Sequence, residues 1–183
     1  YLWDEKLEGN ILCEGAQGFW LDINYGNYPY ITSSNTLPYG ACSLGFSPKL
    51  INKIYGASKI YDTRSGLDPE FPEELLEDNE LLDIVNIGKE YGTTTGRKRK
   101  VNWLNLKKLQ KAIDISGTTD LVISKLDVLE NIQKFKLFNT KLISFDNIDL
   151  MKEFIDHHLL KNCKFLKTII YSNNAEYINE LII

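Results

Sequence analysis

The stretch Leu106-Lys-Lys-Leu-Gln-Lys-Ala-Ile-Asp-Ile-Ser-Gly-Thr-Thr-Asp-Leu-Val-Ile-Ser124 joins a helix pattern directly to a strand pattern. Gly117 supplies the usual C-terminal stop of a helix, after an apolar stripe at helical spacing formed by Leu106, Leu109, Ala112 and Ile113. The apolar run Leu121-Val-Ile123 predicts a buried strand over residues 120–124. A helix that leads into a buried strand is the unit from which α/β folds with parallel sheets are built.

Similar patterns extend in both directions along the chain. Ser47 and Pro48 suit the start of a helix, because serine is a common N-cap residue and proline is tolerated in the first helical turn. Helices are expected over residues 48–59, 81–91, 106–116, 147–160 and 175–182, and strands over residues 10–13, 60–64, 120–124, 134–138 and 165–171. We therefore predict an α/β fold with a largely parallel sheet flanked by helices, as a single domain over residues 1–183.

The composition is that of a globular protein, with 183 residues, 43% hydrophobic and 25% charged. A net charge of −4 argues against general nucleic-acid binding, and no apolar run is long enough to span a membrane. Charge is uneven, since residues 70–83 hold seven acids and no base while residues 97–100 are all basic. Three widely separated cysteines indicate reduced thiols, a cytoplasmic location and no metal site.

The first motif is Ile11-Leu-Cys-Glu-Gly-Ala-Gln-Gly18, followed by Ile31-Thr-Ser-Ser-Asn-Thr36. These loops offer many hydrogen-bonding groups and little charge, which suits an uncharged base and a phosphate better than a metal ion. The amide of Gln17 can donate and accept at a purine edge, although a glycine-flanked turn also places a glutamine on the surface. The Thr32 hydroxyl could bind a phosphate, or alternatively it could form a turn by hydrogen bonding to the local backbone.

The second motif is Gly92-Thr-Thr-Thr-Gly-Arg-Lys-Arg-Lys100. Hydroxyls and backbone amides beside glycine favour anions, and arginines add bidentate donors for carboxylate or phosphate. A basic run can equally be a solvated surface. With little apolar surface and four adjacent positive charges, this loop is expected to be mobile until an anion binds.

The third motif, Ser124-Lys-Leu-Asp-Val-Leu-Glu130, follows the apolar strand of residues 120–124. A carboxylate here, that of Asp127, can accept two hydrogen bonds from the N1–H and N2–H₂ edge of guanine, and adenine presents no such pair. An ordinary ion pair at the strand end is the alternative interpretation.

The three motifs, in this order, closely resemble adenylosuccinate synthetase, the ligase that joins L-aspartate to IMP using GTP. The resemblance implies part of that family's P-loop-type α/β fold. It also implies an IMP site formed by Gln17, Thr32 and Arg97, and an aspartate site formed by Thr93, Thr94, Thr95, Gly96, Arg97, Lys98 and Arg99. The implied GTP site consists of Arg99, Lys125, Leu126 and Asp127.

Family members carry a further segment in front, with a Gly-Asp-Glu-Gly-Lys-Gly phosphate loop whose aspartate is the general base and a Mg²⁺ ligand, and with a histidine that is the general acid. The resemblance therefore implies no catalytic or metal-binding residue in this chain, GTP and Mg²⁺ as family requirements, and a homodimer. The alternatives are a degenerate or split non-catalytic nucleotide-binding protein, a nucleic-acid-binding module built on the basic run, and a ligase that acts on a 2-aminopurine nucleotide.

Overall fold

The computed structural model describes residues 8–92 and 96–173. The chain divides into two compact units, Tyr1–Ile51 and Asn52–Ile183. The single domain over residues 1–183 stays a prediction. No helix in the described part of the chain is both long and apolar enough to cross a membrane.

The first unit is built from loops and short 3₁₀ helices. These helices are η1 (Phe19–Leu21), η2 (Pro38–Leu44) and η3 (Pro48–Leu50). The strand predicted over residues 10–13 is wrong, because this segment is irregular and exposed in the structure. A short apolar run becomes a strand only where a neighbouring strand takes up its backbone hydrogen bonds, and this run pairs with none of the described strands.

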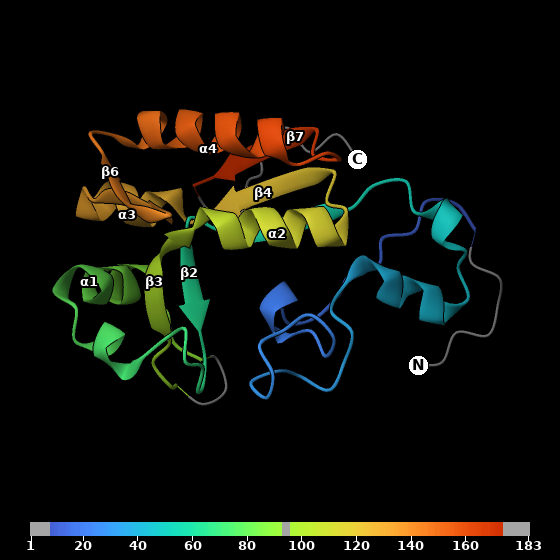
Figure 1. The fold of residues 1–183 in the computed structure, drawn as a ribbon, viewed down its shortest axis with the longest axis horizontal. Coiled ribbons are helices and arrows are strands. Elements are labelled where there is room, and N and C mark those ends of the chain that lie inside the picture. The colour runs from blue at the N-terminus through green and yellow to red at the C-terminus, as the bar shows by residue number, and fades with distance from the viewer. Residues whose placement is uncertain (1–7, 93–95, 174–183) are drawn as a thin grey trace. The chain divides into compact units, whose positions relative to one another are not determined.

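The second unit contains a parallel sheet of three strands, β1 (Tyr55–Lys59), β4 (Asp120–Ser124) and β7 (Thr168–Ser172) (Figure 1). The central strand, β4, pairs in parallel with β1 on one side and β7 on the other. Its Leu121 and Ile123 are completely buried. The expected parallel sheet is therefore present, and β4 has the bounds that the apolar run predicts.

A second sheet follows the order β2 (Tyr61–Arg64), β3 (Lys100–Asn105), β5 (Phe135–Asn139) and β6 (Lys141–Phe145). Only the β3–β5 pair in it is parallel, while β2–β3 and β5–β6 are antiparallel. The α/β class is confirmed, and the sheet structure is parallel in one sheet and mixed in the other.

Four α-helices cover these sheets: α1 (Asn79–Gly88), α2 (Leu106–Ser116), α3 (Leu126–Ile132) and α4 (Ile148–Asn162) in the described part of the chain. Side chains of Asp78, Asn105 and Asn147 accept hydrogen bonds at the N-termini of α1, α2 and α4. Gly117 ends α2 with a φ of 69°, as its position in the sequence predicts.

The helix predicted over residues 48–59 is wrong beyond its first turn. Ser47 does accept a hydrogen bond from the Lys49 amide, but η3 ends at Leu50. Residues 55–59 instead form β1, which pairs with β4 along its whole length. Sheet pairing thus overrides a weak helical pattern. The helix predicted over residues 175–182 lies outside the described residues.

Candidate functional site

The carboxyl edge of the parallel sheet gathers polar side chains. Lys59 ends β1 and lies opposite Ser124, which ends β4, and Ser124 in turn lies opposite Ser172 of β7. The Ser124 hydroxyl donates to the carbonyl of Ser58 over 3.1 Å, which ties the ends of β1 and β4 together. Ligands of open α/β sheets bind beyond this edge, so it is the natural place for a site.

Lys125 and Asp127 follow β4 at this edge. The Lys125 ammonium donates to the carbonyl of Gly88, the last residue of α1, over 3.2 Å. Asp127 lies in the first turn of α3 and is partly exposed. Its carboxylate has no hydrogen-bond partner among the described residues. A carboxylate in this position can therefore accept hydrogen bonds from a ligand.

Five residues other than glycine have a positive φ in the described part of the chain. Lys89 and Gln133 end α1 and α3, and Thr140 forms the turn between β5 and β6, so helix ends and a turn account for these three. The remaining two are Gln17, with a φ of 64°, and Lys125, which precedes the first turn of α3 and has a φ of 69°, unlike the usual extended backbone at the start of a helix. Backbone strain of this kind concentrates at functional sites, and both residues are predicted ligand contacts.

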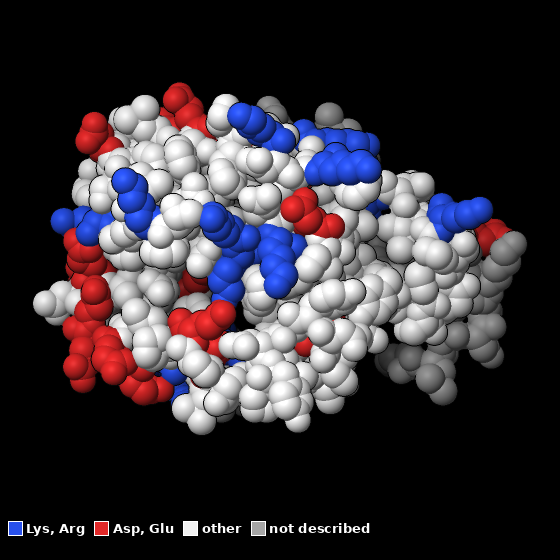
Figure 2. All heavy atoms as spheres, in the orientation of Figure 1, with Lys and Arg blue, Asp and Glu red and all other residues white. Residues whose placement is uncertain are grey.

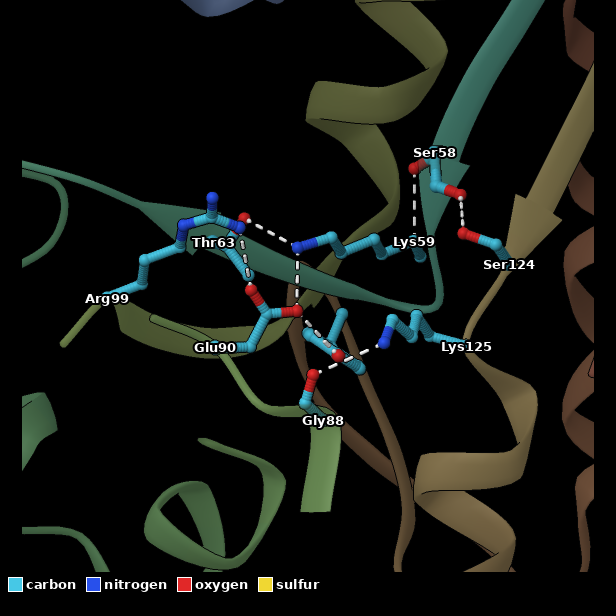
Figure 3. Close-up of polar contacts among 9 residues, drawn as sticks. Ser58, Lys59, Thr63, Gly88, Glu90, Arg99, Ser124 and Lys125 are labelled. Carbon is cyan, nitrogen blue, oxygen red and sulfur yellow. Dashed lines mark hydrogen bonds and ion pairs between the residues drawn. The ribbon is translucent and has the colours of Figure 1, made fainter. Parts of the chain in front are cut away.

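Glu90 lies at the centre of a network of charged side chains (Figure 3). Its carboxylate is buried, with 2% of the side chain exposed, and pairs with the Lys59 ammonium at 2.6 Å and the Arg99 guanidinium at 3.0 Å. The Tyr61 hydroxyl donates to the same carboxylate over 2.8 Å. Three donors therefore compensate one buried negative charge, as a buried carboxylate requires.

The protonation states in this network follow from burial and pairing. Burial raises the pKa of Glu90, but the donors, with Lys59 first, outweigh it and hold this pKa below 4.5, so the carboxylate is ionised at neutral pH. Burial lowers the pKa of Lys59, and the pairing with Glu90 opposes this only in part. Burial and the Glu90 charge together raise the pKa of Tyr61, which keeps its proton.

The basic loop begins and ends at this network. The Arg99 amide donates to the Glu90 carbonyl over 2.9 Å, and the Gly92 amide donates to the Arg97 carbonyl over 2.8 Å. An antiparallel bridge between Tyr91 and Lys98 lies between these bonds. The loop is therefore closed at its base, where Gly96 and Arg97 are exposed. The predicted aspartate contacts Thr93, Thr94 and Thr95, and with them the expected mobility of the loop, lie outside the described residues.

Gln17 and Thr32 lie in the first unit. Gln17 is exposed, and its side-chain oxygen accepts a hydrogen bond from the Ser34 hydroxyl over 3.3 Å. The Thr32 amide donates to the Leu21 carbonyl over 2.8 Å. Gln17 is therefore brought to the serine-rich segment of residues 31–36, so the two parts of the first motif do lie together.

Asp22 organises this unit from its interior, although it is not among the site residues that the motifs predict. It is fully buried and accepts hydrogen bonds from the amides of Asn24, Tyr25 and Thr36 at 2.8, 3.1 and 2.6 Å. Burial raises its pKa, but the backbone donors, led by Thr36, outweigh it and lower the pKa. Asp22 thus fixes the start and the end of the loop that carries Thr32.

Within the second unit, the structure brings Arg99, Lys125 and Asp127 to one edge. Leu126 is buried in the core, so its side chain packs inside the protein. Lys59 and Glu90 are not among the site residues that the motifs predict. The available signal for Glu90 was an acid two residues before the motif that begins at Gly92, and the mistaken helix over residues 48–59 hid the position of Lys59 at a strand end.

The acidic run of residues 70–83 lies on the surface over α1 and the 3₁₀ helix η4 (Glu73–Leu76) (Figure 2). Several of its acids pair with lysines from other elements, in the pairs Glu70–Lys108, Glu73–Lys100, Glu80–Lys134 and Glu80–Lys136. Lys100 of the basic run is itself buried against Glu73. The two charged segments are therefore partly neutralised by pairing, and the basic run is less basic than its sequence suggests.

In the described part of the chain, no group of three or more His, Cys, Asp or Glu side chains lies together so that it could hold a metal ion. The described residues do not fit a Mg²⁺ site. The expectation that the metal ligands lie in another segment stays a prediction.

Comparison with known proteins gives a consistent result. A family model described as adenylosuccinate synthetase matches residues 1–164. The adenylosuccinate synthetase of Thermodesulfovibrio yellowstonii is 49% identical over 128 residues, which cover 69% of this chain and 30% of the relative. That of Chlorobium chlorochromatii is 43% identical over 162 residues, which cover 87% of this chain and 36% of the relative. The chain spans about a third of the length of these curated relatives.

Two solved structures share the fold. Fully ligated adenylosuccinate synthetase from Plasmodium falciparum matches with a TM-score of 0.70 and 28% identity, over 88% of this chain and 47% of the other. Succinoaminodeoxyadenylate synthetase of cyanophage S-2L matches with a TM-score of 0.56 and 15% identity, over 86% of this chain and 41% of the other. The second likeness is one of fold alone.

Proposed function

Because the chain belongs to the adenylosuccinate synthetase family, a family of ligases of purine biosynthesis, we propose that it forms the nucleotide-binding and aspartate-binding part of a GTP-dependent enzyme that joins L-aspartate to IMP. The observation that carries the proposal is the placement of Asp127 and Lys125 beyond the carboxyl end of the central parallel strand.

Asp127 reads the guanine base in this proposal. Its partly exposed carboxylate offers two acceptor oxygens, and guanine presents the matching pair of donors on N1 and N2. Lys125 lies beside it, held by the Gly88 carbonyl, and Arg99 contributes a positive charge to the same edge. Leu126 supports these contacts from the core.

The basic loop and the first unit bind the other two substrates, L-aspartate and IMP. Thr93, Thr94, Thr95, Gly96, Arg97, Lys98 and Arg99 bind the carboxylates of L-aspartate. Gln17 binds the purine edge of IMP, Thr32 its phosphate, and Arg97 contacts IMP as well. These assignments rest on the resemblance of the motifs, on the exposure of Gln17 and Arg97, and on the bond that holds Gln17 to Ser34.

The reaction itself needs groups beyond this chain. In the family it proceeds by transfer of the γ-phosphoryl group of GTP to the 6-oxygen of IMP, after which the aspartate amine displaces phosphate. Such transfer depends on positioning and on charge stabilisation by a phosphate loop and Mg²⁺. We assign this chain the substrate-contacting part, and assign the base, the acid and the metal ligands to a preceding segment in a cytoplasmic homodimer.

An activity assay with two protein components tests the proposal. The 183-residue chain alone should form no adenylosuccinate from IMP, GTP and aspartate, and adding the preceding segment of a family member should give turnover that Gln17→Ala abolishes. Turnover by the chain alone, or turnover in the mixture that Gln17→Ala leaves unchanged, would contradict the assignment.

A nucleic-acid-binding module receives no support from the structure. Two of the four residues in the basic run are engaged in ion pairs, Arg99 with Glu90 and Lys100 with Glu73. The remaining alternative is a protein that binds guanine nucleotides without catalysis. It differs from the proposal in one result, since it predicts nucleotide binding and no turnover in the mixture.

A further inference from the structure

We propose that Glu90 is a positioning residue, whose buried carboxylate holds the Arg99 and Lys59 side chains at the carboxyl edge of the β1–β4–β7 sheet. The inference rests on the proposed function, because it states how the cations of the nucleotide site are kept in place. Glu90 does not itself contact substrate in this account.

The two carboxylate oxygens of Glu90 accept hydrogen bonds from different side chains. Oε1 accepts from the Lys59 ammonium at 2.6 Å and from the Tyr61 hydroxyl at 2.8 Å. Oε2 accepts from Arg99 at 3.0 Å. Arg99 and Lys59 each keep about a quarter to a third of the side chain exposed, at 32% and 26%, whereas Glu90 is 2% exposed. The carboxylate thus lies beneath two cations that face solvent (Figure 3).

The backbone around Glu90 is fixed as firmly as its side chain. The Glu90 amide donates to the Val85 carbonyl and its carbonyl accepts from the Arg99 amide, each over 2.9 Å. Gly88 leaves room for the Tyr61 hydroxyl, which would lie only 2.5 Å from a Cβ at that position. Glu90 therefore links the end of α1, the strands β1 and β2, and the segment that enters β3.

Two physical effects predict opposite results when the charge of Glu90 is removed. If Glu90 only competes with a phosphate for Arg99 and Lys59, then Glu90→Gln makes the site more positive and tightens nucleotide binding. If Glu90 positions the two cations, the same substitution releases both side chains and weakens binding, despite the gain in positive charge. The sign of the change therefore decides between the two roles.

Limited trypsin digestion of the full chain tests the hold on Arg99 directly. Trypsin must take the side chain of the cleaved residue into its own pocket, so Arg99 has to leave Glu90 first. Mass spectrometry should show that Glu90→Gln raises cleavage after Arg99 about tenfold relative to cleavage after the exposed Arg97, as expected for the loss of a charge-assisted hydrogen bond. Glu80→Gln, which removes an acid paired with Lys134 and Lys136, should leave the ratio unchanged.

The second experiment measures the affinity of the Glu90 variants for GDP by calorimetry. Glu90→Gln should weaken GDP binding, and Glu90→Asp, which keeps the charge on a shorter side chain, should raise the cleavage ratio less and retain part of the affinity. Glu90→Asp also carries the test if Glu90→Gln fails to fold. An unchanged Arg99-to-Arg97 ratio in the Glu90 variants, or tighter GDP binding, overturns the inference. If the unaltered chain binds no GDP while the cleavage ratio rises, the proposed nucleotide site fails and the hold of Glu90 on Arg99 stands.

Discussion

Replacing Gly88 by alanine should destabilise the second unit, because the new methyl group would lie too close to the Tyr61 hydroxyl. A Cβ at Gly88 would lie 2.5 Å from the Tyr61 hydroxyl oxygen, a distance that van der Waals repulsion forbids. Tyr61 is 1% exposed and cannot move aside freely, so its hydroxyl must leave Glu90. Gly88→Ala therefore removes a hydrogen bond to a buried charge without touching either partner.

The expected cost follows from three effects. Losing a hydrogen bond to a charged group costs about 1.5–3 kcal/mol, and crowding a packed core costs about 1–3 kcal/mol. Alanine is favoured over glycine by about 1 kcal/mol inside a helix, and by less at the last residue of α1. We expect the free energy of unfolding to fall by about 2–5 kcal/mol.

Urea denaturation followed by circular dichroism measures this change, and a double-mutant cycle isolates its cause. In a Tyr61→Phe background the hydroxyl is gone, and the nearest remaining ring atom is Cζ at an ordinary 3.5 Å. Gly88→Ala should then cost less than about 1 kcal/mol. Equal costs in both backgrounds would refute the reasoning, because they would show that the hydroxyl is not what the new methyl group meets.

Three further predictions concern single side chains. Burial raises the pKa of Asp62 to about 6, above its unfolded value of 3.8, so the contribution of Asp62 to stability is full below pH 3.8 and falls by up to about 3 kcal/mol as the pH rises through 6; in urea titrations Asp62→Asn should remove this component of the pH dependence and stabilise the protein at pH 7. Asp22→Ala should speed amide hydrogen exchange at Asn24, Tyr25 and Thr36 about 30-fold, since about 2 kcal/mol of buried hydrogen bonding is lost, and unchanged exchange would deny Asp22 its organising role. In the reconstituted enzyme, Arg97→Leu should raise the aspartate requirement by the equivalent of about 1.5–3 kcal/mol and Arg97→Lys should recover only part of this loss; if neither changes it, the loop is only a solvated basic turn.

The local sequence was sufficient to predict those helices and strands whose apolar pattern agrees with their packing in the fold. The helix α2 and the strand β4 follow from the apolar stripe, Gly117 and the apolar run after it. The strands β3 and β6 were not predicted, because β3 depends on pairing with β2 and β5, and β6 depends on pairing with β5. The same dependence explains β1, where pairing with β4 replaced the expected helix.

The candidate site was predictable to the extent that its residues lie within motifs. Lys125 and Asp127 directly follow an apolar strand, so their position at the sheet edge could be inferred. Glu90 and Lys59 meet only after the chain folds, since 31 residues separate them, and no local pattern links an acid at a helix end to a lysine at a strand end. Asp22 could not be predicted, because a buried acid that accepts hydrogen bonds from backbone amides cannot be distinguished in the sequence from any other polar loop residue.

The preference for guanine over adenine nucleotides tests the central claim most directly. Isothermal calorimetry of the unaltered chain with GDP and ADP, repeated with Asp127→Asn, compares the two bases at the carboxyl edge of the parallel sheet. The account predicts that GDP binds at least about tenfold more tightly than ADP, which corresponds to about 1.4 kcal/mol, and that Asp127→Asn reduces this difference. Equal affinities for GDP and ADP in the unaltered chain would contradict it.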